Sequence, residues 1–329
     1  MENKRNWRWG VNRWLVLLFI ILGAVAASFY PPLLPHIQLP AEAVAHIGGF
    51  AITNSMIAML IADLIVLVIA WIVRRAATSG QMVPTGFSGA MEALLEAIYN
   101  LTESTAGRWA KQIFPWFATI TIYVLIANWM ELIPGVDSIG LIEHAEGGAG
   151  HAVGTVLPGI ITLLPGKGDF TLVSFVRVLS TDLNFTVALA LIVVFMTQVM
   201  GVRALGPSYF TKFINVKTVF TRPIFGVIDF AVGLLEIVSE ISRILSFSFR
   251  LFGNLFAGTV LLFVIGTLVP VFAQSIFLML EFFVGIIQAL VFGMLAMVFM
   301  SMATQGHGGE HEEERHEAEE MPVPGPEMI

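Results

Sequence analysis

The sequence contains no cysteine and few charged residues. Lysine, arginine, aspartate and glutamate together make up 12% of its 329 residues, whereas 57% of the residues are hydrophobic. The absence of cysteine excludes disulfide bonds, thiol chemistry and iron–sulfur ligation by this chain. A soluble domain of this length has no need for so much apolar surface. The composition therefore predicts a multi-pass membrane protein.

Signatures of nucleotide-binding and hydrolytic enzymes are also missing. No glycine-rich loop ending in Lys-Ser or Lys-Thr occurs, so the chain is not expected to bind nucleotide. Neither a His-Glu-x-x-His motif nor a Ser/His/Asp set is present, which argues against an intramembrane hydrolase. The histidines after residue 306 are interpreted as part of a solvated acidic segment rather than as a metal site. We predict no enzyme activity, metal, cofactor or nucleic-acid partner.

Long apolar runs recur along the chain and organise it. A helix of about 20 apolar residues crosses the hydrocarbon core of a bilayer. Such spans are predicted at 56–73, 117–133, 183–202 and 274–302, and a longer apolar stretch covers 224–268. A surface helix is predicted over 89–109. The predicted fold class is all-α integral membrane, with five to six transmembrane helices and a long, steeply tilted C-terminal hairpin over 224–303.

The remaining segments differ from these spans in composition. Residues 1–30 begin with basic and tryptophan residues and contain an apolar run, which fits either an extra first span or a removable signal peptide. Residues 31–305 form the predicted membrane domain, in which the proline-rich start is extended and 135–181 is a glycine- and proline-rich loop. Residues 306–329 are predicted to be an acidic disordered tail.

The distribution of lysine and arginine predicts the orientation of the spans. Of 17 such residues, 13 lie in 1–13, 74–111, 203–222 and the tail, whereas only Lys167 and Arg177 lie in loops on the opposite side. Cytoplasmic segments are enriched in these residues. The C-terminus is therefore predicted to be cytoplasmic, as is the N-terminus if the first span is retained.

Residues 236–258 carry a row of polar side chains within an apolar stretch. They recur at steps of three, four and seven: Glu236, Ser239, Arg243, Ser246, Arg250 and Asn254. At helical spacing these side chains share one face. A charge at membrane depth costs at least ~2.5–3.5 kcal/mol, so this face should turn toward protein or water. The structural alternative is an ordinary buried ion pair, such as Glu240 with Arg243.

The stretch 224–268 is too long to stand upright in a bilayer. At ~1.5 Å per residue a continuous helix would be about 65 Å long, roughly twice the hydrocarbon thickness. It must be broken or steeply tilted. The last span carries a second polar stripe that includes Glu281 and Gln288. Counted from the turn near Val271, Gln288 lies about as deep as Arg250, and Glu281 about level with Thr259, so the stripes can face each other.

The most informative single residue is Arg250. An arginine does not give up its proton, because its pKa exceeds ~12, so its use in the membrane is as a fixed positive charge. Such a charge would attract a passing carboxylate, force it to release its cation, and block a direct leak across the bilayer. Carboxylates on either side could then form entry and exit routes. The sequence offers no moving carboxylate, which would have to belong to a partner.

The segment 248–258, SFRLFGNLFAG, resembles the signature of subunit a of the F-type ATP synthase. Residues 128–134 and 182–184, and Gln288 on the last span, extend the resemblance over most of the chain. The resemblance implies a proton-translocating stator subunit in a bacterial inner membrane. Its implied partners are the ring of c subunits, the peripheral-stalk b subunits, other subunits of the synthase and the lipid bilayer.

The resemblance also implies roles for individual residues. Arg250 would separate two half-channels with Gln288 as its neighbour, and Asn254 would line the same region. Glu236 and Ser239 would serve the cytoplasmic half-channel, and Glu281 the periplasmic one. Glu240 is a further candidate for proton translocation. Many relatives have Glu or His nine residues after the arginine, where this chain has Thr259. The auxiliary candidates are Thr259, Asp182, Glu131 and Arg243.

A self-contained ion-coupled secondary transporter is the alternative function. Transporters of this kind usually repeat their architecture within one chain. The pattern of 236–258 has no second copy in the sequence.

Overall fold

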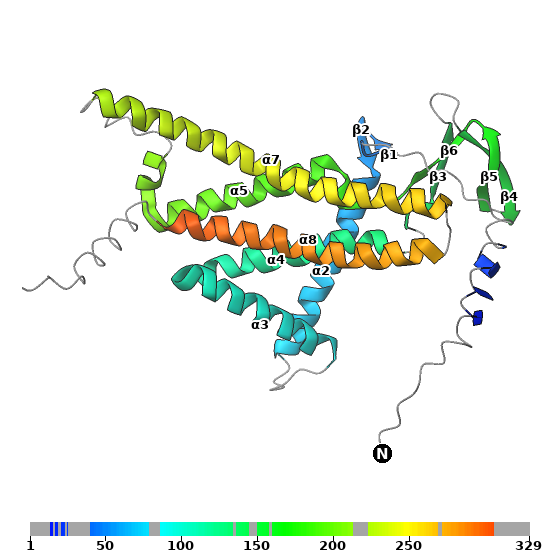
Figure 1. The fold of residues 1–329 in the computed structure, drawn as a ribbon, viewed down its shortest axis with the longest axis horizontal. Coiled ribbons are helices and arrows are strands. Elements are labelled where there is room, and N and C mark those ends of the chain that lie inside the picture. Colours follow the sequence, from blue (N-terminus) through cyan, green and yellow to red (C-terminus); the bar gives the residue numbers. More distant parts are fainter. Residues whose placement is uncertain are drawn as a thin grey trace, which may run out of the picture. The chain divides into compact units, whose positions relative to one another are not determined.

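The computed structural model describes residues 40–78, 86–133, 136–144, 150–157, 160–212, 223–268 and 272–305, with a few positions between 14 and 25. Its long helices are α2 (Asn54–Thr78), α3 (Phe87–Ala106), α4 (Ala110–Trp129), α5 (Leu183–Leu205), α7 (Pro223–Leu268) and α8 (Phe272–Thr304) (Figure 1). Five helical stretches in these ranges are long and apolar enough to cross a membrane. The predicted membrane class is confirmed. Most of the first apolar run and the tail 306–329 lie outside the described residues.

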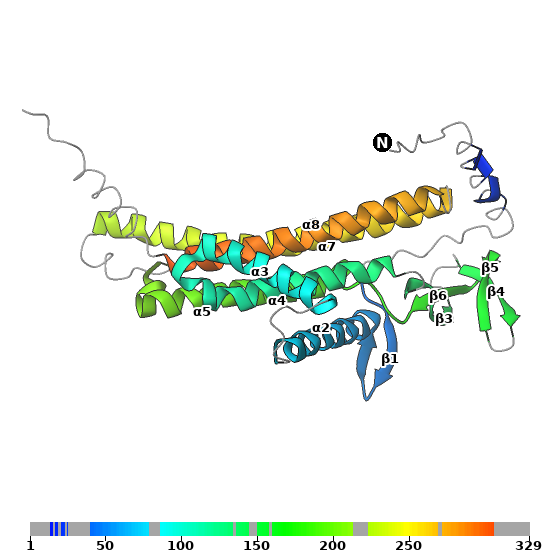
Figure 2. The same ribbon diagram turned by 90° about the horizontal axis from the view of Figure 1, so that it is seen from below.

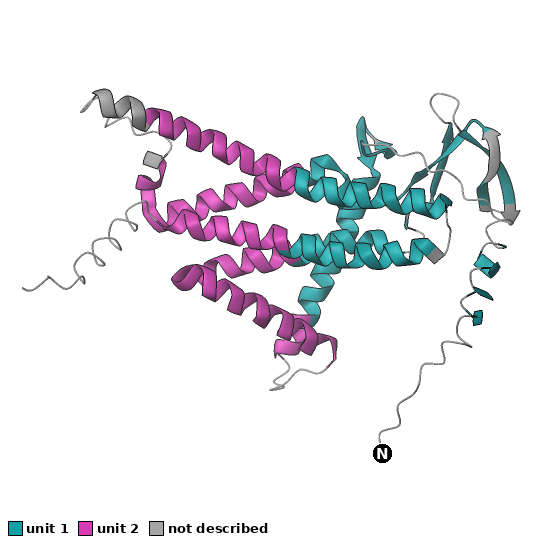
Figure 3. Ribbon diagram, in the orientation of Figure 1, with its two compact units in different colours: residues 1–72, 122–186, 249–290 teal, residues 73–121, 187–248, 291–329 magenta. Residues whose placement is uncertain are grey.

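The chain folds into two compact units, coloured separately in Figure 3. Unit 1 comprises residues 1–72, 122–186 and 249–290, and unit 2 comprises residues 73–121, 187–248 and 291–329. Both units are built from segments distant in the sequence. Helices α7 and α8 contribute residues to each unit, and so each unit holds part of both helices of the predicted hairpin.

In unit 1, small residues let helices α2 and α4 pack closely. Ala58 and Ala62 of α2 and Ala127 of α4 are completely buried, together with Leu179 and Met130. Small side chains at a membrane helix contact allow the backbones to approach. Figure 1 shows α2 of this unit at a steep angle to α7 and α8, and in Figure 2 the same helix is foreshortened. These helices therefore cannot all lie along the membrane normal.

Helix α7 is continuous over its 46 residues. The sequence left a broken helix and a tilted one as alternatives, and the structure has the unbroken helix. At ~1.5 Å per residue it is about 69 Å long, more than twice the hydrocarbon thickness. An upright orientation would push apolar residues far into water on at least one side, and we therefore expect a steep tilt. The 33 residues of α8 exceed the thickness of the membrane as well.

The segments between the spans contain small sheets that the sequence analysis did not predict. Strands β1 (Ala43–Ile47) and β2 (Phe50–Thr53) form a hairpin whose two turn glycines have φ of 56° and 89°. A four-stranded antiparallel sheet of order β3-β6-β4-β5 occupies much of 140–174. Its strands are β3 (Gly140–His144), β4 (Gly150–Leu157), β5 (Ile160–Gly168) and β6 (Phe170–Ser174). The prediction of a loop over 135–181 was wrong. The glycine and proline content of this segment indicated a loop, but the structure has four strands there that pair with one another.

Helix α4 begins earlier than the predicted third span. It starts at Ala110, directly after the 3₁₀ turn η1 (Gly107–Trp109) that joins it to the predicted surface helix α3. Pro115 lies inside α4 near its start. As the sixth residue of α4 it lies beyond the first turn, and it therefore removes one backbone hydrogen bond of the helix.

Gly293 of α8 offers a test of packing in unit 2. A Cβ atom there would overlap the Thr121 hydroxyl and crowd the buried Phe117 ring of α4. We expect Gly293→Ala to destabilise the chain by about 1–3 kcal/mol, because overpacking costs more than the better helix propensity of alanine returns. Thermal unfolding of the purified full-length chain in detergent measures this. Gly253→Ala is the matched control, since no atom lies within 4 Å of its Cβ position; equal stability of the two variants would contradict the expectation.

Candidate functional site

The polar stripe of α7 lies along the border between the buried and the exposed sides of the helix. Glu236, Arg243 and Arg250 are half-buried, whereas Ser246 and Asn254 are exposed. Leu251 and Leu255, beside the stripe, are almost completely buried. The stripe thus turns partly toward the protein and partly outward, which places Arg250 at an edge rather than in the core.

In unit 1, Asn254 joins the two predicted stripes. Its side-chain amide donates a hydrogen bond of 2.8 Å to the Oε1 atom of Gln288 on α8. Asn254 follows Arg250 by one helical turn, and Gln288 is only 4% exposed. The prediction that the stripes of the two helices face each other is confirmed at this level.

Glu281 of α8 lies against the backbone of α7 at Gly258. Its carboxylate occupies the space that a side chain at Gly258 would fill, and Glu281 is only 7% exposed. The Oε2 atom of Glu281 has no hydrogen-bond partner among the described residues. The sequence predicted Glu281 to be level with Thr259, and the structure places it one residue away. Gly258 therefore makes room for a buried acid.

A second carboxylate reaches the same part of α7 from the end of α4. Glu131 lies in the 3₁₀ turn η2 (Met130–Leu132), and its Oε1 atom is 2.6 Å from the hydroxyl of Thr259. The same hydroxyl is 2.9 Å from the carbonyl oxygen of Leu255. A threonine hydroxyl has one hydrogen, so it donates to one of these acceptors at a time. The two acids Glu131 and Glu281 thus contact neighbouring residues of α7, Thr259 and Gly258.

Asn128, which the sequence analysis gave no role of its own, holds this arrangement together. Its Oδ1 atom accepts a hydrogen bond of 2.6 Å from Ser180, and its amide donates one of 3.2 Å to the carbonyl of Gly285. The next residue, Trp129, stacks on Phe282 with ring centroids 4.9 Å apart. These contacts join the end of α4 to α8 and so fix the position of the turn that carries Glu131.

Asp182, an auxiliary candidate, has a structural role. Its Oδ1 atom accepts a hydrogen bond of 2.9 Å from the backbone N–H of Asn184 at the start of α5. This is the contact of a helix N-cap, which satisfies one of the free backbone donors. Ser180, two residues earlier, donates its hydroxyl to Asn128.

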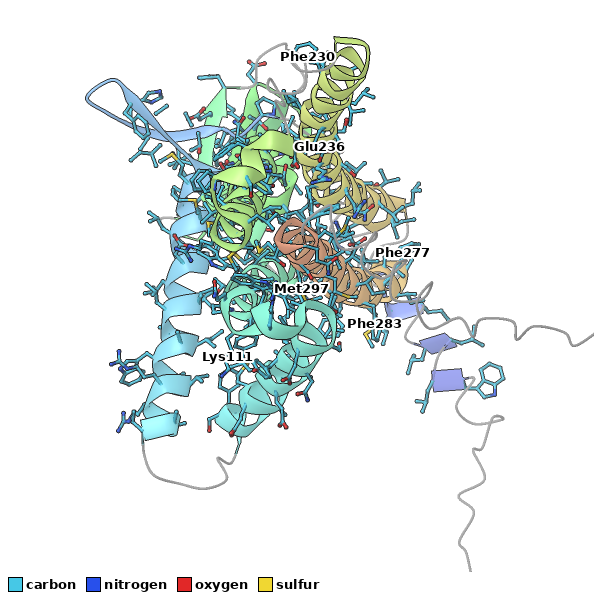
Figure 4. All side chains as sticks on the ribbon, turned by 90° about the vertical axis from the view of Figure 1, so that its left-hand side faces the viewer. Lys111, Phe230, Glu236, Phe277, Phe283 and Met297 are labelled. Carbon is cyan, nitrogen blue, oxygen red and sulfur yellow. The ribbon has the colours of Figure 1, made fainter. Side chains whose placement is uncertain are left out.

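In unit 2, a cluster of charges lies on α7 before Arg250. Arg243 donates a hydrogen bond of 2.8 Å from Nη1 to Oε1 of Glu240, and its Nη2 atom is 3.9 Å from Oε1 of Glu236. The predicted alternative of an ion pair between Glu240 and Arg243 is therefore present. Figure 4 labels Glu236 on this helix. Ser239 is half-buried between Glu236 and Glu240 in the sequence.

Tyr209 also belongs to this cluster and was missed by the sequence analysis. It lies in the 3₁₀ segment η5 (Gly206–Lys212), is 3% exposed, and donates a hydrogen bond of 2.8 Å to Oε1 of Gln198. Its ring occupies the space that a side chain at Gly201 would fill. Tyr209 interacts electrostatically with the charged groups of Glu240, Arg243 and Glu236. The charges of the cluster therefore act on a buried hydroxyl of another element.

Apolar side chains on the outer sides of α7 and α8 are uncovered. In unit 2 they include Leu235, Val238, Ile241 and Leu245, and in unit 1 they include Phe249, Met279, Phe283 and Ile287. Phe283, labelled in Figure 4, is 50% exposed. Such a surface suits lipid or an apolar partner.

The polar groups of the site are carboxylates, hydroxyls, amides and fixed cations. The described residues contain no group of three side chains suited to hold a metal ion.

Comparisons with known proteins agree with one another. A family model described as "ATP synthase A chain" matches residues 56–301. The chain is 31% identical over 209 residues to "ATP synthase subunit a" of a Nitratiruptor species, which covers 63% of this chain and 70% of that protein. It is 28% identical over 215 residues to the protein of the same name from Campylobacter fetus, covering 64% and 73%. A similar protein from Acinetobacter baumannii is 31% identical over 197 residues, covering 59% and 62%.

The Asn128 contacts predict a coupled effect on stability. Asn128→Ala leaves the Ser180 hydroxyl and the Gly285 carbonyl without this partner, and we expect a cost of about 1–2 kcal/mol. Ser180→Ala should cost less, and the double variant should cost less than the sum of the two, because both remove the same bond. Thermal unfolding of the three variants measures the coupling. Strictly additive costs would contradict a shared interaction.

Proposed function

The chain belongs to the family of ATP synthase A chains, and from this we propose that it is the stator subunit through which protons reach and leave the rotor. It is a multi-pass membrane subunit of the F-type ATP synthase. The nucleotide chemistry of the complex then belongs to other subunits. In this role the subunit would couple proton flow to rotation and so to ATP synthesis.

The observation that carries the proposal is the position of Arg250. Arg250 is half-buried on α7, one turn before the residue that makes the Asn254–Gln288 hydrogen bond of 2.8 Å. An arginine stays charged at any accessible pH, so a carboxylic acid that moves past it would be driven to release its proton. A fixed cation also repels hydrated protons. Arg250 would in this way separate an entry route from an exit route.

The two groups of acids supply the routes. In unit 2, Glu236 and Ser239 would form the cytoplasmic half-channel. In unit 1, Glu281 would form the periplasmic half-channel together with Glu131 and Thr259. Many relatives place an acid or histidine at the position of Thr259, and the 2.6 Å contact supports Glu131 as the group that supplies a carboxylate here instead. The outer route would then use two carboxylates on different helices.

The proposed partner of this face is the ring of c subunits. The rotor would supply the moving carboxylate that this chain lacks, and the uncovered apolar side chains of α7 would pack against its helices. Peripheral-stalk b subunits and other synthase subunits would hold the chain in place. The three relatives named above are bacterial proteins, and we propose the bacterial inner membrane as the location, with a cytoplasmic C-terminus.

Replacement of Arg250 tests the function directly. In inverted membrane vesicles that contain the whole synthase, we expect Arg250→Ala to abolish ATP-driven proton pumping, because nothing would then force the rotor acid to release its proton. The loss should exceed about a hundredfold, which corresponds to about 2.7 kcal/mol. Quenching of a pH-sensitive dye measures pumping, and ATP hydrolysis with immunoblotting shows that the complex is assembled.

Two results would reject the proposal. Unchanged pumping by an assembled Arg250→Ala complex would show that the charge is dispensable. Ion flux through the purified chain alone, without ring subunits, would instead favour the self-contained transporter.

The Thr259–Glu131 contact predicts a smaller effect on the outer route. Thr259→Val keeps the shape of the side chain but removes the hydroxyl, and we expect pumping to fall about tenfold, the equivalent of about 1.4 kcal/mol. Thr259→Ser should restore most of the rate. Thr267→Val on the same helix is the matched control, since its hydroxyl donates to the Val264 carbonyl. Similar rates for Thr259→Val and Thr267→Val would argue against a role for the contact.

A further inference from the structure

The cluster of charges in unit 2 has one arginine for two carboxylates, and the arginine binds them unequally. We propose that Arg243 holds Glu240 as its permanent counter-ion and thereby leaves Glu236 as the acid that exchanges protons. Arg243 and Glu240 are in this view positioning residues for Glu236. The inference rests on the proposed function of the subunit. It assigns proton exchange to Glu236 and the positioning of Glu236 to the other two residues.

The distances separate the two carboxylates. The contact of 2.8 Å between Arg243 and Glu240 has the length of a charge-assisted hydrogen bond. The 3.9 Å between Arg243 and Glu236 is too long for a hydrogen bond and leaves only a Coulomb attraction. Arg243 therefore stabilises the ionised form of Glu240 more strongly than that of Glu236.

The two carboxylates also differ in burial, and Glu240 is again the one held more firmly by the protein. The side chain of Glu240 is 11% exposed and that of Glu236 is 23% exposed. A carboxylate that is deeply buried needs a close cation to remain charged, whereas a more accessible one keeps water nearby. Glu236 is thus the carboxylate that water can reach more easily, as proton exchange with the cytoplasm requires.

Arg243 is held in place by an aromatic side chain of α8. Its Cζ atom lies 4.8 Å from the centroid of the Phe299 ring, a cation–π contact. Phe299 packs edge-on against Phe247, which packs in the same way against Phe292. From another element, Tyr209 contributes a neutral hydroxyl that donates to Gln198. The contact with Phe299 holds the guanidinium beside Glu240.

The pair of Arg243 and Glu240 cancels its own charge, and this decides the state of Glu236. With Glu240 present, Glu236 lies beside a nearly neutral pair that attracts its carboxylate only weakly. Without the Glu240 carboxylate, the nearest acid available to Arg243 on this helix is Glu236, already within 3.9 Å. Arg243 would then hold Glu236 as a permanent carboxylate and stop proton exchange.

Charge removal in two steps tests this division of roles. In vesicles that contain the whole synthase, Glu240→Gln should lower ATP-driven proton pumping about tenfold, the equivalent of about 1.4 kcal/mol. The double variant Glu240→Gln/Arg243→Gln should recover most of the lost rate, because the cation that captures Glu236 is gone. Glu236→Gln should be slow and should not be rescued by Arg243→Gln. Rates are normalised to assembled complex, and a purely structural role would not produce rescue by a second substitution.

The outcomes separate this inference from the function on which it rests. A double variant as slow as Glu240→Gln would show that Glu240 itself carries protons and would overturn the inference. Full pumping by Glu240→Gln would overturn it as well. Arg250→Ala, measured in the same series, tests only the proposed function, so its pumping rate distinguishes the two failures.

Discussion

The energetic cost of an ionised side chain in hydrocarbon governs most of this structure. It explains why the charges of α7 share one stripe and why that stripe follows the border of the buried side. It also explains why buried acids of the membrane part lie against polar features of other residues. Glu240 has an arginine and Glu131 has a hydroxyl. Glu281 is the exception, because its carboxylate fills the space beside Gly258 and its Oε2 atom has no hydrogen-bond partner among the described residues.

Two arginines seven residues apart look equivalent in the sequence but have different surroundings. Arg243 has acids three and seven residues before it on its own helix, and the structure joins it to both. Arg250 has serine, phenylalanine, glycine and asparagine at the positions one turn away. Local spacing thus separates an arginine that is paired within its own helix from one that has no acid within a turn of it on that helix. The ion-pair alternative was right for Arg243.

Features with a regular period along the chain could be predicted from the sequence, and contacts between distant segments could not. The spans, the unusual length of α7 and the facing stripes of α7 and α8 follow from helical periodicity and apolar content. The contact of Thr259 with Glu131 joins residues 128 positions apart, and no local sequence pattern predicts it. The sheet over 140–174 was missed because the glycine and proline content of this segment indicated a loop. The capping contact of Asp182 with Asn184, in contrast, is local in the sequence.

The hydroxyl of Thr259 has a single hydrogen and two acceptors in reach, the Glu131 carboxylate and the Leu255 carbonyl. Turning the O–H bond from one to the other requires no movement of either helix. Side-chain rotations of this kind take picoseconds to nanoseconds, whereas domain motions take microseconds or longer. The group can therefore follow every change in the charge of its acid neighbour without setting the pace of any slower step.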